Sequence, residues 1–213
     1  MDISQLDTTH LAALAAALGW ASGLRLYAVV FLTGLAGYLG WVPLPDGLKL
    51  LQNPVVMGAS GTMLAVEFFA DKIPGLDSIW DAVHTVIRIP AGAALAAGVF
   101  GGDQATWAWV AALAGGTLAA TSHAAKTTTR AAVNTSPEPL SNLALSLAGD
   151  VAVPAMLWAA WEHPAWFFAA LAVAVVVSLV LTFVLLRFLR GLLRRVRGWF
   201  SDVAPPERPG EVG

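Results

Sequence analysis

The sequence predicts an all-α, polytopic membrane protein, a transmembrane bundle of about six helical spans. The first observation is composition: 57% of the 213 residues are hydrophobic, only 12% are charged, and the mean hydropathy is +0.69. A soluble domain is about 45–50% apolar and about 25% charged, so this chain has too little polar surface to cover a globule in water. The second observation is that the apolar residues fall into runs of the length, about 20 residues, that crosses a bilayer.

The spans are separated by segments rich in proline, glycine and asparagine, which favour turns. The predicted spans are residues 11–41, 54–70, 77–100, 105–132, 140–161 and 164–186. This division gives a short N-terminal segment (1–10), a transmembrane domain (11–188) and a tail (189–213) that is first basic and then disordered by its composition.

Two of these spans have more than one interpretation. Residues 11–41 form either one long tilted helix or two pieces broken near residues 20–23. The third span is polar before Pro90 and apolar after it, so residues 77–88 either cross the membrane or lie at its surface.

The distribution of basic residues predicts the orientation. Five of the twelve lysines and arginines lie between Arg187 and Arg197, directly after the last apolar run. The positive-inside rule therefore predicts a cytoplasmic C-terminus. Six spans then predict a cytoplasmic N-terminus as well, with Lys49 as the only basic residue on the opposite side.

The two halves of the chain share a weak pattern. Pro54 precedes Glu67 by the same interval that separates Pro137 from Asp150, so each half has a loop proline, an apolar helix and one acid inside it. The pattern favours two inverted three-helix repeats, residues 11–100 and 105–188, an architecture common among transporters.

Arg25 is the plainest charged residue inside a predicted span. A charge at bilayer depth costs several kcal/mol unless it is paired or hydrated, so it indicates a functional or structural role. Two interpretations stay open: an ion pair with Glu67 or Asp150 that locks helices together, or a direct role in binding a ligand or an ion.

Two further groups of polar residues repeat at helical spacing. In the third span the spacing is four, three and four, and in the fourth it is three and four, so each group lies on one helical face. The groups are Asp77, Asp81, His84 and Arg88, and then His123, Lys126 and Arg130. The two faces either neutralise each other or line a cavity with a basic floor that suits a phosphate or carboxylate group.

A cation site is a further hypothesis. Asp71, Asp77 and Asp81 lie close together where the second span ends, and carboxylate oxygens bind divalent cations. Their spacing matches no defined metal loop. The chain has no cysteine, no glycine-rich phosphate loop and no zinc-protease motif, so no cofactor is expected. The net charge of −2 gives no support for nucleic-acid binding.

Several segments resemble a bacterial membrane family known as domain of unknown function 4126. They are residues 23–27 (GLRLY), 67–81 (EFFADKIPGLDSIWD), 123–134 (HAAKTTTRAAVN), 136–142 (SPEPLSN) and 146–150 (SLAGD). The similarity extends over about residues 10–190. The family usually has an acidic pair where this chain has Gly149 and Asp150. The resemblance implies an all-helical protein of the bacterial inner membrane, with both termini cytoplasmic on the topology above, and implies no particular activity.

The function that these features favour is a small transporter or channel, with a cytoplasm-facing polar cleft for an anionic or zwitterionic solute. The expected cleft residues are Arg25, Glu67, His84, Arg88, His123, Lys126, Arg130 and Asp150. The expected partners are the lipid bilayer, an unidentified small solute and, because the chain is short for a transporter, a second copy. The alternatives are a structural or assembly protein with buried ion pairs and, less favoured, an intramembrane enzyme acting on lipids.

Overall fold

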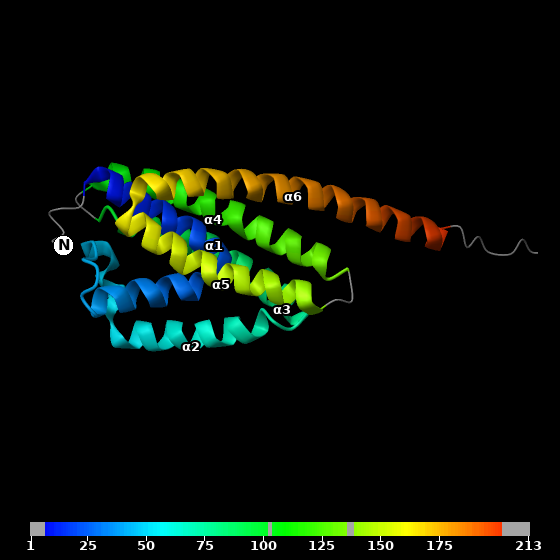
Figure 1. The fold of residues 1–213 in the computed structure, drawn as a ribbon, viewed down its shortest axis with the longest axis horizontal. Coiled ribbons are helices and arrows are strands. Elements are labelled where there is room, and N and C mark those ends of the chain that lie inside the picture. Colours follow the sequence, from blue (N-terminus) through cyan, green and yellow to red (C-terminus); the bar gives the residue numbers. More distant parts are fainter. Residues whose placement is uncertain (1–6, 102–103, 136–138, 202–213) are drawn as a thin grey trace, which may run out of the picture.

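The computed structural model describes residues 7–101, 104–135 and 139–201, and its regular elements are all helical (Figure 1). The elements are α1 (Thr8–Tyr38), the short 3₁₀ helix η2 (Asp46–Gln52), α2 (Pro54–Ala70), α3 (Leu76–Gly98), α4 (Ala105–Val133), α5 (Pro139–Glu162) and α6 (Pro164–Ser201). The helices lie roughly along one axis as a bundle, and α6 extends well beyond the others (Figure 1).

Helix α1 folds back on itself at Arg25. This residue has non-helical backbone angles, φ −148° and ψ 82°, and it divides α1 into a first arm, residues 8–24, and a second arm, residues 26–38. Leu14 and Leu32 line the same pocket, although a straight helix would hold residues 18 positions apart about 27 Å from each other. Figure 1 likewise shows the second arm returning toward the end of the bundle at which the first arm begins. The structure therefore shows two helical pieces in residues 11–41 and not one long helix. The break lies at Arg25, just after residues 20–23, near which it was predicted.

The hairpin changes the predicted topology. The first arm of α1 begins at one end of the bundle, and α6 runs past the opposite end (Figure 1). The placement of both ends of the chain in the cytoplasm therefore stays a prediction, which the hairpin does not favour, because a segment expected to cross once instead returns to the end of the bundle at which it begins.

The apolar helices are those of a membrane protein, but six spans are not confirmed. In the part of the chain that the structure describes, three helices are able to cross a membrane by length and composition alone: α1, if its two arms are counted as one helix, residues 140–162 of α5 and residues 164–195 of α6. Helix α2 is apolar but shorter. The first two elements of the two predicted repeats also differ, since α1 is a hairpin and α4 is continuous. The inverted-repeat arrangement stays a hypothesis.

The first arm of α1 packs closely against α3 and α4 through small residues. A Cβ added to Gly19 would lie 2.5 Å from the Cα of Gly115, and one added to Gly92 would lie 2.7 Å from the Cβ of Ala119. Glycine at these positions lets the backbones approach and pack over a large area, as is common between helices in membranes. This close packing fixes the side chains of α4 against the break in α1.

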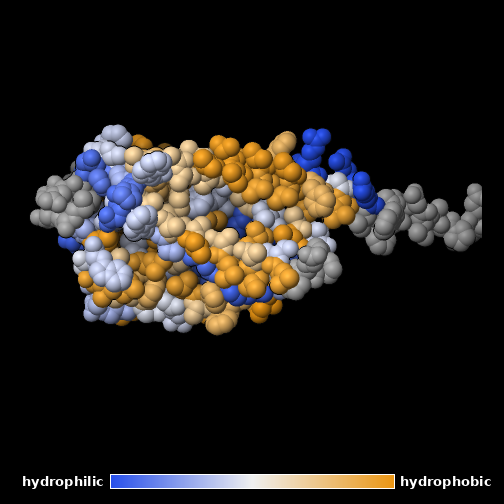
Figure 2. Space-filling view, viewed as in Figure 1, coloured by the Kyte–Doolittle hydropathy of each residue, from blue (hydrophilic) through white to orange (hydrophobic). Residues whose placement is uncertain are grey.

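The outer surface of the bundle is largely apolar. Figure 2 shows hydrophobic surface along α6 and the neighbouring helices, with hydrophilic surface concentrated toward the ends. On α6 the exposed apolar side chains include Val173, Val176, Val180 and Phe183. Such a belt suits contact with lipid chains, whereas the polar residues of α3 and α4 face inward.

Candidate functional site

A network of ionised side chains lies inside the bundle near the tip of the α1 hairpin. It joins five basic and five acidic residues through ion pairs, so their formal charges sum to zero. The members are Arg25, Lys72, Arg88, Lys126 and Arg130, and Glu67, Asp71, Asp77, Asp81 and Asp150. Except for Lys72 and Asp150 on its edge, all of them are nearly or fully shielded from solvent. Charges are tolerated in such an interior only when they are paired in this way.

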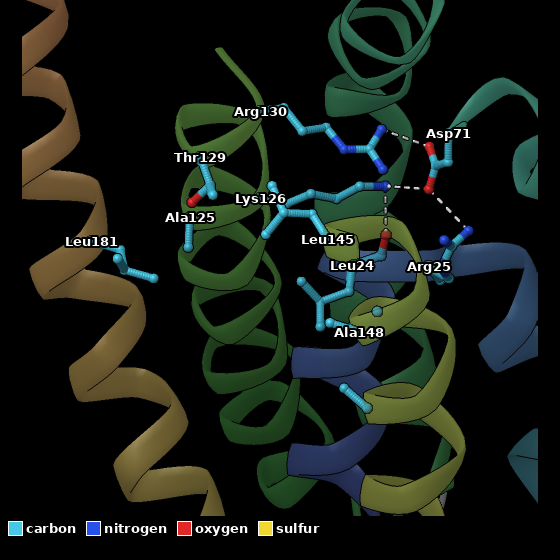
Figure 3. A pocket seen from close by; sticks show the side chains of 12 residues that line it. Leu24, Arg25, Asp71, Ala125, Lys126, Thr129, Arg130, Leu145, Ala148 and Leu181 are labelled. Atoms are coloured by element: carbon cyan, nitrogen blue, oxygen red, sulfur yellow. Dashed lines mark hydrogen bonds and ion pairs between the residues drawn. The ribbon is translucent and has the colours of Figure 1, made fainter. Parts of the chain in front are cut away.

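Asp71 is the centre of the network. It follows α2 directly, as the residue that caps the C-terminus of that helix. Its carboxylate lies 2.9 Å from Arg25 Nη1, 2.8 Å from Arg130 Nη1 and 3.2 Å from Lys126 Nζ (Figure 3). Burial alone would raise the pKa of Asp71, but these three cations lower it to about 2. Asp71 is therefore ionised at neutral pH and holds α1, α2 and α4 together.

Arg88 forms a second centre on α3. Its guanidinium lies 2.5 Å from Glu67 Oε1 and 2.7 Å from Asp81 Oδ1, and all three residues are fully or almost fully buried. Asp81 also pairs with Lys126 at 3.0 Å and Arg130 at 3.3 Å. Glu67, by contrast, has Arg88 as its only ion-pair partner among the described residues, and its Oε2 has no hydrogen-bond partner there. Among the described residues, the neutralisation of Glu67 thus depends on Arg88 alone, whereas Asp81 has two further cationic partners.

His123 on α4 contacts the network through Thr85 and Arg88 and not through an ion pair. Its Nε2 lies 2.7 Å from the hydroxyl of Thr85, and its Nδ1 lies 3.3 Å from Arg88 Nη1. Thr85 already donates its single hydroxyl proton to the carbonyl of Asp81, so it must accept a hydrogen bond from the imidazole. A proton on Nε2 satisfies both contacts, because Nδ1 is then free to accept from Arg88, and the 3.2 Å approach of Nδ1 to the carbonyl of Gly23 is then a contact without a hydrogen bond.

Arg25 links the hairpin tip to α5. Its Nη2 lies 2.9 Å from Asp150 Oδ1 and donates to the carbonyl and the hydroxyl of Ser146, each at 3.0 Å. Asp150 also pairs with Lys72 at 3.4 Å, and the ammonium of Lys72 lies over the ring of Phe68. The outermost pair of the network is therefore Lys72 and Asp150.

Side chains of α4 donate hydrogen bonds to backbone carbonyls of α1 near its break. Lys126 Nζ donates to the carbonyl of Leu24 at 2.9 Å, and the hydroxyl of Ser122 donates to the carbonyl of Trp20 at 2.6 Å. A backbone carbonyl without a partner is costly at membrane depth, so broken helices persist only where other groups satisfy the freed positions. Lys126 consequently serves both the charge network and the hairpin fold.

A pocket of about 220 Å³ opens beside Asp71, between α4, α5 and α6. Three cations and one carboxylate line its inner wall, together with Thr129, and small or apolar residues of α5 and α6 line the rest. Figure 3 shows Arg25, Lys126 and Arg130 converging on Asp71 at this pocket, and Figure 2 shows hydrophilic surface in a hollow between α5 and α6. The Nε of Arg25 has no hydrogen-bond partner among the described residues. The pocket wall therefore has three cations and one carboxylate, whereas the network as a whole has equal numbers of the two.

Of the eight cleft residues expected from the sequence, six are members of the network and a seventh, His123, contacts it through Arg88. These are Arg25, Glu67, Arg88, His123, Lys126, Arg130 and Asp150. His84 is the exception. It stacks on Trp80 at a ring distance of 4.1 Å and contacts the hydroxyl of Tyr27 at 3.1 Å, so it is buried among aromatic side chains.

The two polar faces predicted for the third and fourth spans face each other. Their charges pair directly, so the interpretation in which they neutralise each other describes most of the interior. Asp77 lies at the N-terminal end of the α3 face, where it is buried and accepts hydrogen bonds from Asn134 at 3.1 and 3.3 Å.

The cation site considered at Asp71, Asp77 and Asp81 gains no support from the geometry. Lysine and arginine side chains occupy the carboxylate oxygens of Asp71 and Asp81. Among the described residues, no three histidine, cysteine or acidic side chains come together as a metal-binding group.

Sequence reasoning missed three contributors to this region. Lys72 and Ser146 contact Asp150 or Arg25 directly, but lysine in a turn and serine in a helix gave no distinctive signal. Asn142 is 1% exposed, and both polar atoms of its side chain lack partners among the described residues. It lies four residues before Ser146, one turn away on the same face of α5.

The family comparison covers most of this architecture. The family described as "Domain of unknown function (DUF4126)" matches residues 12–186, which include both arms of the α1 hairpin and every member of the network. The chain belongs to the DUF4126 family. No curated protein and no solved structure matches it. For this DUF4126 protein, function must therefore be argued from the site itself.

Proposed function

We propose that this DUF4126 protein is a small membrane transporter that binds a solute with a carboxylate or phosphate group in the pocket beside Asp71. The observation that carries the proposal is the composition of the pocket wall, where Arg25, Lys126 and Arg130 lie beside a single lining carboxylate, that of Asp71. Guanidinium groups bind carboxylates and phosphates through paired hydrogen bonds. The Nε of Arg25 is buried and has no hydrogen-bond partner among the described residues, so a bound group that reaches it would meet a free donor.

The fold around the pocket supports the same function. A helix broken inside the bundle, with side chains capping its freed carbonyls, is typical of the substrate sites of transporters. We place the basic end of α6 in the cytoplasm, in the bacterial inner membrane, by the positive-inside rule. The pocket then lies toward the cytoplasmic half, and the first arm of α1 begins on the opposite side.

A second candidate is a structural membrane protein in which the charges only lock the helices together. The observation that favours it is that every carboxylate of the network has a cationic partner and the formal charges sum to zero. In that case the pocket would be inaccessible to solutes, and this difference can be measured.

The absence of cysteine makes the test direct. Thr129→Cys places a thiol on the pocket wall, and Val180→Cys places one on the apolar outer face of α6 as a matched control. We expect Thr129→Cys to react with small water-soluble thiol reagents, and roughly tenfold faster with an anionic reagent than with a cationic one of the same size, because the local field concentrates anions. Val180→Cys should react with neither. An unreactive Thr129→Cys, or a faster cationic reagent, would contradict the proposal.

Transport itself is tested in proteoliposomes with labelled inorganic phosphate and a set of small carboxylates. Thr129→Trp fills the pocket without removing an ion pair, so it should stop uptake while the melting temperature stays close to that of the wild type. Uptake that is unaffected by Thr129→Trp would exclude this pocket as the transport site.

A further inference from the structure

The last turns of α6 carry a basic surface that the proposed transport site does not use. At about 1.5 Å per residue, the 38 residues of α6 measure about 57 Å, whereas the hydrocarbon core of a bilayer is about 30 Å thick. Residues 164–186 contain no charged side chain and already suffice to cross it. The turns beyond Arg187 therefore lie at the level of the lipid headgroups, and Figure 1 shows them projecting past the bundle.

These turns have an uneven distribution of charge. Between Arg187 and Ser201 the chain has five arginines and no acidic residue, a local charge of +5, while the buried network sums to zero. Arg187, Arg190, Arg194 and Arg197 follow at intervals of three, four and three, which places them on one face. The face opposite carries Phe188, Leu189 and Leu192. The segment is therefore amphipathic, with a basic face and an apolar face.

The basic face has the geometry of an anion site. Arg190, Arg194 and Arg197 border a hollow on the side of α6 together with Leu193. Within the part of the chain that the structure describes, neither Arg190 nor Arg194 pairs with a carboxylate, and the side chain of Arg194 donates only to the carbonyl of Arg190 at 3.3 Å. The guanidinium groups of Arg190 and Arg194 on this hollow match the oxygens of a phosphate group better than a single charge does.

We propose that this face binds the headgroups of anionic phospholipids in the leaflet at which α6 ends. Three features select lipid over a soluble anion: the arginines directly follow a membrane span, an apolar face lies beside them, and clusters of four to eight basic residues in this position attract anionic lipids. The apolar face then contacts the acyl region while the guanidinium groups contact the phosphates. The surface anchors the end of α6, which few other helices cover.

The experiment uses the full-length protein, purified in mild detergent with an equimolar mixture of phosphatidylglycerol and phosphatidylcholine, and counts retained lipids by native mass spectrometry. The wild type should retain phosphatidylglycerol in preference to phosphatidylcholine. The double variant Arg190→Gln/Arg194→Gln should lose this preference, with at least roughly tenfold weaker retention of phosphatidylglycerol, given the contribution of each arginine near an anionic surface. Lys49→Gln, which removes a cation at the other end of the bundle, is the matched control and should retain lipid as the wild type does.

Two results would overturn the proposal. One is equal retention of both lipids by the wild type. The other is unchanged preference in the double variant, which would place the lipid elsewhere. Because the substituted residues lie outside the packed bundle, the variant should keep wild-type helicity and melting temperature. A variant that unfolds would contradict the placement of these turns outside the core, on which the proposal depends.

Discussion

Removal of Arg88 perturbs the buried network where it has the least redundancy. Arg88→Met keeps most of the side-chain volume but leaves Glu67 without its only ion-pair partner among the described residues, in a site with no solvent exposure. Breaking a buried pair from one side costs about 3–5 kcal/mol, because the remaining charge is buried without compensation. Asp81 adds less to this cost, since Lys126 and Arg130 still neutralise it.

A double-mutant cycle measures this difference. Glu67→Gln removes the stranded charge, so Arg88→Met/Glu67→Gln should recover much of the lost stability, with a coupling energy of roughly 2–3 kcal/mol. Asp81→Asn is the matched control, and its coupling to Arg88 should be smaller by about half or more because Asp81 has three cationic partners. The assay is equilibrium unfolding of the purified protein in mixed micelles, followed by circular dichroism. A cost for Arg88→Met below about 1 kcal/mol, or equal coupling to both acids, would refute the argument from burial and partner number.

Three further predictions concern other parts of the site and the packing. Because the folded pKa of Asp71 is about 2, below its ordinary value of 3.8, its ionisation stabilises the fold fully above about pH 4 and loses this effect as the pH falls toward 2. In thermal melts from pH 7 to 2, the wild type should lose about 2 kcal/mol more than Asp71→Asn, and parallel profiles would contradict this. Gly19→Val should separate α1 from α4 and lower the melting temperature far more than Gly58→Val, since an added Cβ meets Gly115 at 2.5 Å in the first case and open space in the second. Lys72→Gln should cost at most about 1 kcal/mol because its ion pair is at the partly exposed edge of the network, and a larger loss in the same unfolding assay would show that the pair is stronger than its exposure implies.

The helices could be predicted well from the sequence, because a helix that crosses lipid needs an uninterrupted apolar run of about 20 residues. Residues 54–70 and the start of the last helix at Pro164 match the structure, since apolar runs bounded by proline have few alternatives. The α1 hairpin was harder to predict. Both of its arms are apolar, and only Arg25 and its small neighbours indicated a break, a pattern that a tilted helix also fits.

Most members of the network could also be identified from the sequence, although Lys72 could not, and neither could the pairing of acids with bases. Helical spacing placed Asp81 and Arg88 on one face and Lys126 and Arg130 on another, because one helix fixes the relative direction of its own side chains. Which acid meets which base depends on how separate helices pack. The sequence therefore indicated a metal ligand at Asp71, whereas the structure places this residue between three cations.

The α1 hairpin determines where Arg25, the pocket and the ends of the chain lie, so its topology is the most direct test of this account. Thr9→Cys and Trp41→Cys place thiols on exposed residues at the two ends of α1, and Arg195→Cys places one near the end of α6. A membrane-impermeant thiol reagent applied to sealed vesicles of one orientation should label the first two together and Arg195→Cys only from the opposite side. Labelling of Thr9→Cys and Trp41→Cys from opposite sides would mean that α1 crosses the membrane once, and it would contradict the hairpin and the site built at its tip.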